Sequence, residues 1–254
     1  MKTIDLNCDM GEGYGAYEIG QDDAMLEVVS TINLACGFHA GDFSIMSRLC
    51  REAATRGVAV GAHPGYPDLW GFGRRKMAFS DADLENIFAY QIGAAQAVAR
   101  LNGHMLTHVK AHGALGHLVA DEPRIGELFA RVVARLDDAL FVTSMTPRGF
   151  GDIAARAGLR VAHEIYADRA YMDDGRLMPR GQPGAVIHDA QEAVRRVLEM
   201  AEGRCIITAT GKRIPAPVDS ICVHGDSPQA LPIARAIRDA LEAAGWRIQP
   251  FCRA

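Results

Sequence analysis

The chain has 254 residues, of which 49% are hydrophobic and 23% charged, and its formal net charge is -4 at pH 7. This composition is typical of a globular protein and lacks the clustered basic excess that binding to nucleic acid requires. No apolar run is long enough to span a membrane, and carboxylates follow the first residues too soon for a signal peptide. We therefore expect a cytoplasmic protein without a nucleic-acid or membrane partner.

In the first half of the chain, short apolar runs that end in glycine-rich polar segments alternate with helical patterns. The apolar runs predict strands at residues 3–6, 31–36 and 58–62. The helical spacing of apolar residues predicts helices at 43–56, with Gly57 as its stop, and from Asp81 onward, with Ser80 as its N-cap and Gly103 at its end.

The same alternation continues in the second half. Further strands are predicted at 105–110, 139–143, 160–165 and 220–223, and helices around 125–133, near 153–157 and from Asp189 onward. A long loop runs from 166 to about 187, and residues 205–209 and 212–214 are predicted to form a small hairpin. Ser227 and Pro228 are expected to begin the last helix.

Strands that alternate with helices predict a parallel α/β fold. At this length we favour a TIM-like (β/α) barrel that forms a single domain over residues 1–254, with an open doubly wound sheet as the alternative. In either fold the loops after the strands gather at one face, where ligands bind. The polar residues expected at this face are Asp5, Asn7, Asp9, Glu12, His39, Asp42, His63, Asp68, Arg74, Lys110, His112, Glu164, Asp168, Arg169, His224 and Asp226.

Four histidines, His39, His63, His112 and His224, follow strand ends. Their expected convergence with carboxylates indicates a functional site rather than four separate structural histidines. Two uses remain open. The groups can act as general acid and base around a polarised carbonyl, or a subset can bind a divalent metal that activates water. Without an HExxH helix or comparably tight ligand spacing, we favour a site without a metal and keep Asp9, His39 and His63 as the alternative metal ligands.

Three cations, Arg74, Lys110 and Arg169, are expected at the same face and would suit an anionic substrate, although salt bridges to Asp68 and Asp168 are an equally simple role for the arginines. The chain contains neither a P-loop nor a GxGxxG sequence. Its six cysteines form no CxxC pair, which indicates reduced thiols that pack in the core rather than act as nucleophiles.

Several long motifs resemble the LamB/YcsF family, in the same order from Asp5 to about Asp226. They are residues 5–12 (DLNCDMGE), 35–42 (ACGFHAGD), 61–75 (GAHPGYPDLWGFGRR), 112–115 (HGAL), 167–171 (ADRAY), 182–185 (QPGA) and 223–226 (VHGD). The resemblance implies a seven-stranded TIM-like barrel that is the A subunit of an ATP-dependent 5-oxoprolinase. It further implies cleavage of 5-oxo-L-proline, a lactam, to L-glutamate with ATP as co-substrate and with the B and C subunits as partners. Ala111, Gly116, His117 and Gly181 depart from the family pattern, which bears on substrate preference.

From this resemblance and the chemistry of the side chains we assign candidate roles. The candidate catalytic residues are Asp9, His63, Lys110 and His112, with Lys110 neutralising developing negative charge and the others handling the proton and the attacking water. Arg74 or Arg169 would hold the substrate carboxylate. The full set of candidate substrate-binding residues is Asn7, Glu12, His39, Asp42, Asp68, Arg74, Glu164, Asp168, Arg169, His224 and Asp226. A non-catalytic substrate-binding subunit and a stand-alone metal-dependent amidohydrolase or deacetylase are the alternatives.

Overall fold

The computed structural model describes residues 2–252. Its strand β1 (Lys2–Met10) closes the sheet into a ring. It pairs in parallel with β2 (Thr31–Ala35) on one side and with β9 (Ser220–His224) on the other. The ring is completed, in order, by the parallel strands β3 (Ala59–His63), β4 (Leu106–Val109), β5 (Phe141–Met145) and β6 (Arg160–Tyr166). The predicted TIM-like barrel, with seven strands, is confirmed, and the open sheet is excluded.

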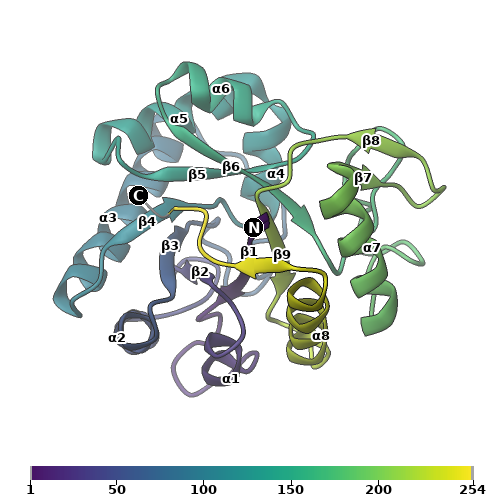
Figure 1. Cartoon of the computed structure of the whole chain (residues 1–254). Coiled ribbons are helices and arrows are strands. Elements are labelled where there is room, and N and C mark those ends of the chain that lie inside the picture. Colours follow the sequence, from purple (N-terminus) through teal and green to yellow (C-terminus); the bar gives the residue numbers. More distant parts are fainter. Residues whose placement is uncertain (1, 253–254) are drawn as a thin grey trace.

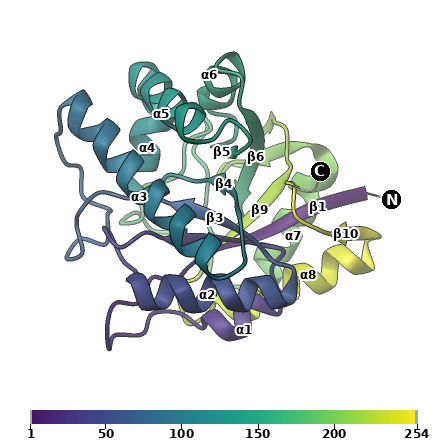
Figure 2. The ribbon, with the colours of Figure 1, turned by 90° about the vertical axis from the view of Figure 1, so that its left-hand side faces the viewer.

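Helices surround this ring of strands (Figure 1). They are α1 (Asp22–Leu26), α2 (Phe43–Arg56), α3 (Asp81–Leu101), α4 (Gly113–Asp121), α5 (Pro123–Leu136), α6 (Phe150–Arg156), α7 (Ala190–Gly203) and α8 (Ala230–Ala243). In Figure 2, α2 and α3 run along the outside of the strands. The hairpin of β7 (Cys205–Ile207) and β8 (Arg213–Pro215) lies outside the ring, as predicted. Within residues 2–252, no helix is long and apolar enough to cross a bilayer.

Capping residues in the sequence predicted some helix boundaries correctly and others wrongly. The side chains of Ser80 and Asp189 accept hydrogen bonds from the first turns of α3 and α7, and Gly57 ends α2 with a φ of 66°. The predicted start of the last helix at Ser227 is wrong, because α8 begins at Ala230 after a turn that contains Pro228. The short helix α1, the helix α4 and the strand β10 (Trp246–Ile248), which pairs with the beginning of β1, were not predicted.

The interior of the barrel is polar along β1, which is longer than the predicted 3–6. Its side chains alternate, as in any strand, so that Leu6, Cys8 and Met10 belong to the hydrophobic core while Asp5, Asn7 and Asp9 form hydrogen bonds with residues of the neighbouring strands β2 and β9. Asp5 lies opposite Ser220, the first residue of β9, and therefore near the amino end of the strands. The expectation that Asp5 belongs to the ligand-binding face is wrong.

The ionisation of Asp5 should make the free energy of unfolding depend on pH, whatever the activity of the protein. The carboxyl of Asp5 accepts hydrogen bonds from the hydroxyls of Ser30, Thr31 and Ser220, yet burial outweighs them and raises its pKa to about 6. Because the folded state holds this proton more tightly than the unfolded state, the contribution of Asp5 to stability is present below about pH 4. It is lost as the pH rises through about 6. The loss amounts to about 3 kcal/mol, since a tenfold change in an ionisation constant is worth about 1.4 kcal/mol.

We therefore expect Asp5→Asn, which resembles the protonated carboxyl, to raise the free energy of unfolding at pH 7 and to leave it nearly unchanged at about pH 4. Urea unfolding of both proteins across this range measures the difference. The exposed Asp138→Asn is the matched control. An equal effect of Asp5→Asn at both ends of the range would show that folding does not raise the pKa of Asp5.

Candidate functional site

Side chains from several strand ends meet at the carboxyl end of the barrel. Asp9 and His63 lie at the ends of β1 and β3, whereas Glu12 and His39 come from the loops after β1 and β2, and His112 precedes α4. All of them are buried. The segment from Pro64 to Arg75 covers the histidines, and within it the carbonyl oxygen of Phe72 lies 2.8 Å from the ring of His112. The predicted convergence of these residues is confirmed.

Lys110 is the centre of an ionic group inside the barrel. Its Nζ lies 2.9 Å from Oδ1 of Asp9 and 3.1 Å from Oε2 of Glu164, and it lies over the ring of Tyr166. Burial alone would lower the pKa of Lys110, but the carboxylates raise it well above its ordinary value. Lys110 is therefore charged at neutral pH, and Asp9 and Glu164 balance its charge.

Polar residues that were not predicted hold this group in place. Nδ2 of Asn33 donates to both Asn7 (2.7 Å) and Asp9 (2.8 Å), and Asn33 Oδ1 lies 2.9 Å from the ring of His108. Nδ2 of Asn7 in turn donates to Glu164 and to Ser220. Asn33, His108 and Ser220 lie within strands, so a search of strand exits could not find them. The alternation of polar and apolar residues along β1 was the available signal for a polar interior.

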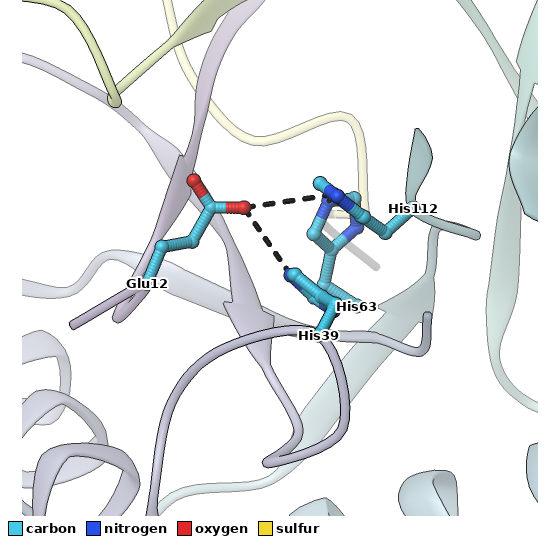
Figure 3. A group of neighbouring side chains, drawn as sticks. All are labelled: Glu12, His39, His63 and His112. Carbon is cyan, nitrogen blue, oxygen red and sulfur yellow. Dashed lines mark hydrogen bonds and ion pairs between the residues drawn. The ribbon is translucent and has the colours of Figure 1, made fainter. Parts of the chain in front are cut away.

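A second group consists of Glu12, His39, His63 and His112 (Figure 3). Oε1 of Glu12 lies 3.2 Å from Nε2 of His39 and 3.5 Å from Nδ1 of His112, and Nδ1 of His112 lies 3.0 Å from Nε2 of His63. The rings of His39 and His112 are stacked with their centroids 3.7 Å apart. Oδ2 of Asp9 is 3.4 Å from His63 Nε2 and so links the two groups.

Burial dominates the electrostatics of this second group. It lowers the pKa values of His39 and His112 well below the ordinary value for histidine, and it raises the pKa of Glu12 to about 8, with a further contribution from the nearby charge of Asp9. For Asp9 burial acts in the same direction, but His63 and Lys110 outweigh it and hold the pKa of Asp9 well below its usual range. At this carboxyl end of the barrel, which we call the mouth, the ionised carboxylate of Asp9 thus lies near the neutral imidazoles of His39 and His112.

The four side chains of the second group could hold one metal ion, because an atom of each lies within 4.8 Å of an atom of the other three. The alternative ligand set expected from the sequence was Asp9, His39 and His63. In the structure, His39 and His63 do belong to the group that could hold a metal, but its carboxylate comes from Glu12 instead of Asp9, and His112 is a fourth member. Asp9 is instead engaged by Lys110 and Asn33.

The outer rim carries ion pairs that the sequence did not predict. Nδ1 of His224 lies 2.9 Å from both oxygens of Asp168, whose pKa is lowered because His224 outweighs the effect of burial. Arg74 pairs with Asp226 at 2.7 Å and not with Asp68.

Arg169 has a different environment from Arg74. It donates to the backbone carbonyls of Met178 and Ala185, and within residues 2–252 no carboxylate lies within 4.0 Å of its guanidinium. Burial and the neighbouring Arg180 lower the pKa of Arg169 to about 10. Arg169 therefore remains charged at neutral pH.

Two of the proposed substrate-binding carboxylates have structural contacts. Asp42 is the N-cap of α2, where it accepts from the backbone N–H groups of Ser44 and Ile45, and its second oxygen accepts from Gly15. Asp68 binds the backbone N–H of Gly71 and the guanidinium of Arg75. These contacts fix the loops that surround the mouth.

The cysteines nearest the site are buried thiols. Burial raises the pKa values of Cys8, Cys36 and Cys222. A thiol whose pKa is raised is a poor nucleophile at neutral pH, so these residues agree with the expected packing role.

Fold and site together define a TIM-like barrel protein with a buried His₃Glu group beside a Lys–carboxylate group at the carboxyl end of its strands. The sequence pattern of the LamB/YcsF family matches residues 4–254. The chain belongs to this family.

Relatives and solved structures agree with this assignment. The chain is 50% identical to a protein of Azorhizobium caulinodans named as the A subunit of 5-oxoprolinase, over 99% of both chains, and 48% identical to the protein of the same name from Gluconobacter oxydans, over 98% of both. The crystal structure of a lactam utilization protein from Thermus thermophilus matches with a TM-score of 0.91 and 41% identity, over 97% of this chain and 99% of that one. A likeness to a peptidoglycan N-acetylglucosamine deacetylase domain from Eubacterium rectale, at 12% identity and a TM-score of 0.52 over 98% of this chain and 88% of that one, reflects the fold alone.

Proposed function

We propose that this chain is the A subunit of an ATP-dependent 5-oxoprolinase, which opens the lactam of 5-oxo-L-proline to L-glutamate together with the B and C subunits in the cytoplasm. The observation that carries the proposal is the 50% identity, over 99% of both chains, to a protein that bears this subunit name. The word subunit in that name supports an assembly with other chains.

The chemistry explains why ATP would be needed. A five-membered lactam is a resonance-stabilised amide that opens slowly in water. Transfer of the terminal phosphoryl group of ATP to the amide oxygen would convert that oxygen into a leaving group. Water would then add to the ring carbon, and the C–N bond would break with protonation of nitrogen to leave an acyl phosphate. A second water would hydrolyse this acyl phosphate to glutamate and phosphate. Because the chain contains neither a P-loop nor a GxGxxG sequence, we place the nucleotide site on a partner subunit.

Arg169 is the side chain that we assign to the substrate carboxylate. It is 4% exposed and has no carboxylate within salt-bridge distance among the described residues. A buried guanidinium without a counter-charge is unfavourable, and a bound carboxylate would supply that charge with matching bidentate geometry. Arg74, the other candidate, already pairs with Asp226.

The two buried groups would then act on the ring. Lys110 would stabilise negative charge that develops on the amide oxygen, and its pairing with Asp9 and Glu164 holds it in one position. Asp9, which is ionised and lies beside His63 and Lys110, is placed to receive a proton from the attacking water. Asn7, Glu12, His39, Asp168, His224 and Asp226 would complete the pocket around the substrate, and Asp42 and Asp68 would contribute by fixing its loops.

The His₃Glu group favours a second candidate function, a stand-alone metal-dependent amidohydrolase. That enzyme would cleave a simple amide or a lactam without ATP, and a chelator would abolish the activity.

One assay separates these possibilities, namely phosphate release and glutamate formation from 5-oxo-L-proline by the chain alone and with its candidate partner subunits. We expect both products only when all subunits, ATP and 5-oxo-L-proline are present. Chelator-sensitive cleavage by the chain alone, without ATP, would establish the second function instead. Glutamate formation by the partners at full rate without this chain would refute its assignment as a catalytic or substrate-binding component.

A further inference from the structure

The hydrogen bonds of His63 and His112 determine which ring nitrogens carry protons. Nδ1 of His63 lies 2.7 Å from the backbone oxygen of Lys110, and Nε2 of His112 lies 2.8 Å from the backbone oxygen of Phe72. Because a carbonyl oxygen can only accept, both of these nitrogens must be protonated. In the neutral rings, Nε2 of His63 and Nδ1 of His112 therefore present lone pairs.

These two lone pairs face each other at 3.0 Å. Two acceptors at this distance repel, so the arrangement requires a positive charge that both nitrogens share. One source is an additional proton on His63, which would then donate to His112 and pair with Asp9 at 3.4 Å. The other source is a metal ion that accepts both lone pairs.

The surroundings favour the metal ion. Glu12 brings a carboxylate oxygen to 3.5 Å from the same nitrogen of His112, and His39 brings a third imidazole to 3.2 Å from that oxygen. Three imidazoles and one carboxylate form a donor set that suits zinc and neighbouring divalent transition metals. The backbone carbonyls that fix the rings of His63 and His112 are the outer partners that metal-binding histidines commonly have.

The loop that covers the rings leaves them little freedom. A Cβ atom at Gly65 would lie 2.5 Å from Nδ1 of His39, and one at Gly73 would lie 2.7 Å from Cβ of His39 and 2.8 Å from Cδ2 of His112. Glycine at both positions thus permits the loop backbone to pack directly on the imidazoles. Nδ1 of His39 is buried with no hydrogen-bond partner among residues 2–252, so no hydrogen bond at that nitrogen fixes which nitrogen of this ring carries the proton.

We propose that Glu12, His39, His63 and His112 bind one divalent transition-metal ion. In this position the ion would supply Lewis acidity toward a carbonyl or phosphoryl oxygen. The proposal concerns binding by this chain alone and does not depend on 5-oxoproline being the substrate.

Metal binding to the purified chain tests the proposal directly. After removal of metal with a chelator, the protein is titrated calorimetrically with Zn²⁺ and separately with Co²⁺, whose visible absorption reports nitrogen coordination. We expect one equivalent to bind, a rise in melting temperature, and a loss of affinity of at least about 100-fold in His63→Ala, His112→Ala and Glu12→Gln. His188→Ala removes an exposed histidine elsewhere and should bind like the wild type.

Asp9→Asn distinguishes the two possible carboxylate ligands, and we expect it to retain the metal. Loss of the metal in Asp9→Asn together with its retention in Glu12→Gln would overturn the assignment of Glu12. The proposal as a whole is wrong if the wild-type chain binds no stoichiometric metal, since the positive charge between the two histidines would then be a proton. It is equally wrong if His63→Ala and His112→Ala, shown by circular dichroism to be folded, bind metal as tightly as the wild type.

Discussion

Replacement of Lys110 by methionine is expected to reduce 5-oxoproline turnover by the assembled enzyme by about 10²- to 10³-fold, which is the usual cost of removing one charge-stabilising donor from an active site. The same change should lower the free energy of unfolding by about 3–5 kcal/mol, because it leaves Asp9 and Glu164 buried without their counter-charge. Turnover is measured as glutamate formed in the presence of ATP, and stability by urea unfolding.

A double variant separates these two effects. Adding Glu164→Gln to Lys110→Met removes one stranded charge, so we expect it to recover part of the stability and none of the activity. Lys76→Met, which changes an exposed lysine outside the barrel, should leave both quantities unchanged. If the double variant regained the wild-type turnover number along with its stability, Lys110 would be a structural residue only.

Arg169→Met is expected to raise the KM for 5-oxo-L-proline by about 100-fold, because truncating one side of a buried charge pair costs about 2–5 kcal/mol. The effect should fall on KM more than on kcat, since the carboxylate of the substrate does not change during ring opening. Arg176→Met, on the same loop but exposed and paired with Asp174, is the matched control.

A substrate without the carboxylate provides a second test of Arg169. With 2-pyrrolidinone, the wild type and Arg169→Met should be about equally poor, because the missing partner removes the advantage of the arginine. A large loss in Arg169→Met with both substrates would show that Arg169 acts by holding the loop through the carbonyls of Met178 and Ala185.

The sequence predicted the site as far as strand direction determines it. His39, His63, His112 and Asp9 each follow or end a strand, and parallel strands that share one direction must bring such residues together. Strand ends alone cannot show which way a side chain points within a strand. Asn33, His108 and Ser220, which hold the ionic group, were therefore missed, and Asp5 was placed at the wrong end of the barrel.

The sequence also could not predict which charged residues far apart in the chain form ion pairs. Arg74 forms an ion pair with Asp226, which lies 152 residues further along the chain. Asp68 pairs instead with Arg75, the residue after Arg74. Only the folded barrel determines this choice between two neighbouring arginines. By contrast, the capping role of Asp42 had a local signal, since it stands immediately before the helical pattern that begins at Phe43.

We expect the lactam to be opened at the carboxyl end of this barrel. A crystal structure of the assembled enzyme with 5-oxo-L-proline bound would test it most directly. We expect the carboxylate of the ligand to lie within hydrogen-bonding distance of Arg169, and its ring to lie between Lys110 and the group of Glu12, His39, His63 and His112. A well-ordered 5-oxoproline bound wholly within a partner subunit, with this mouth left empty, would contradict it.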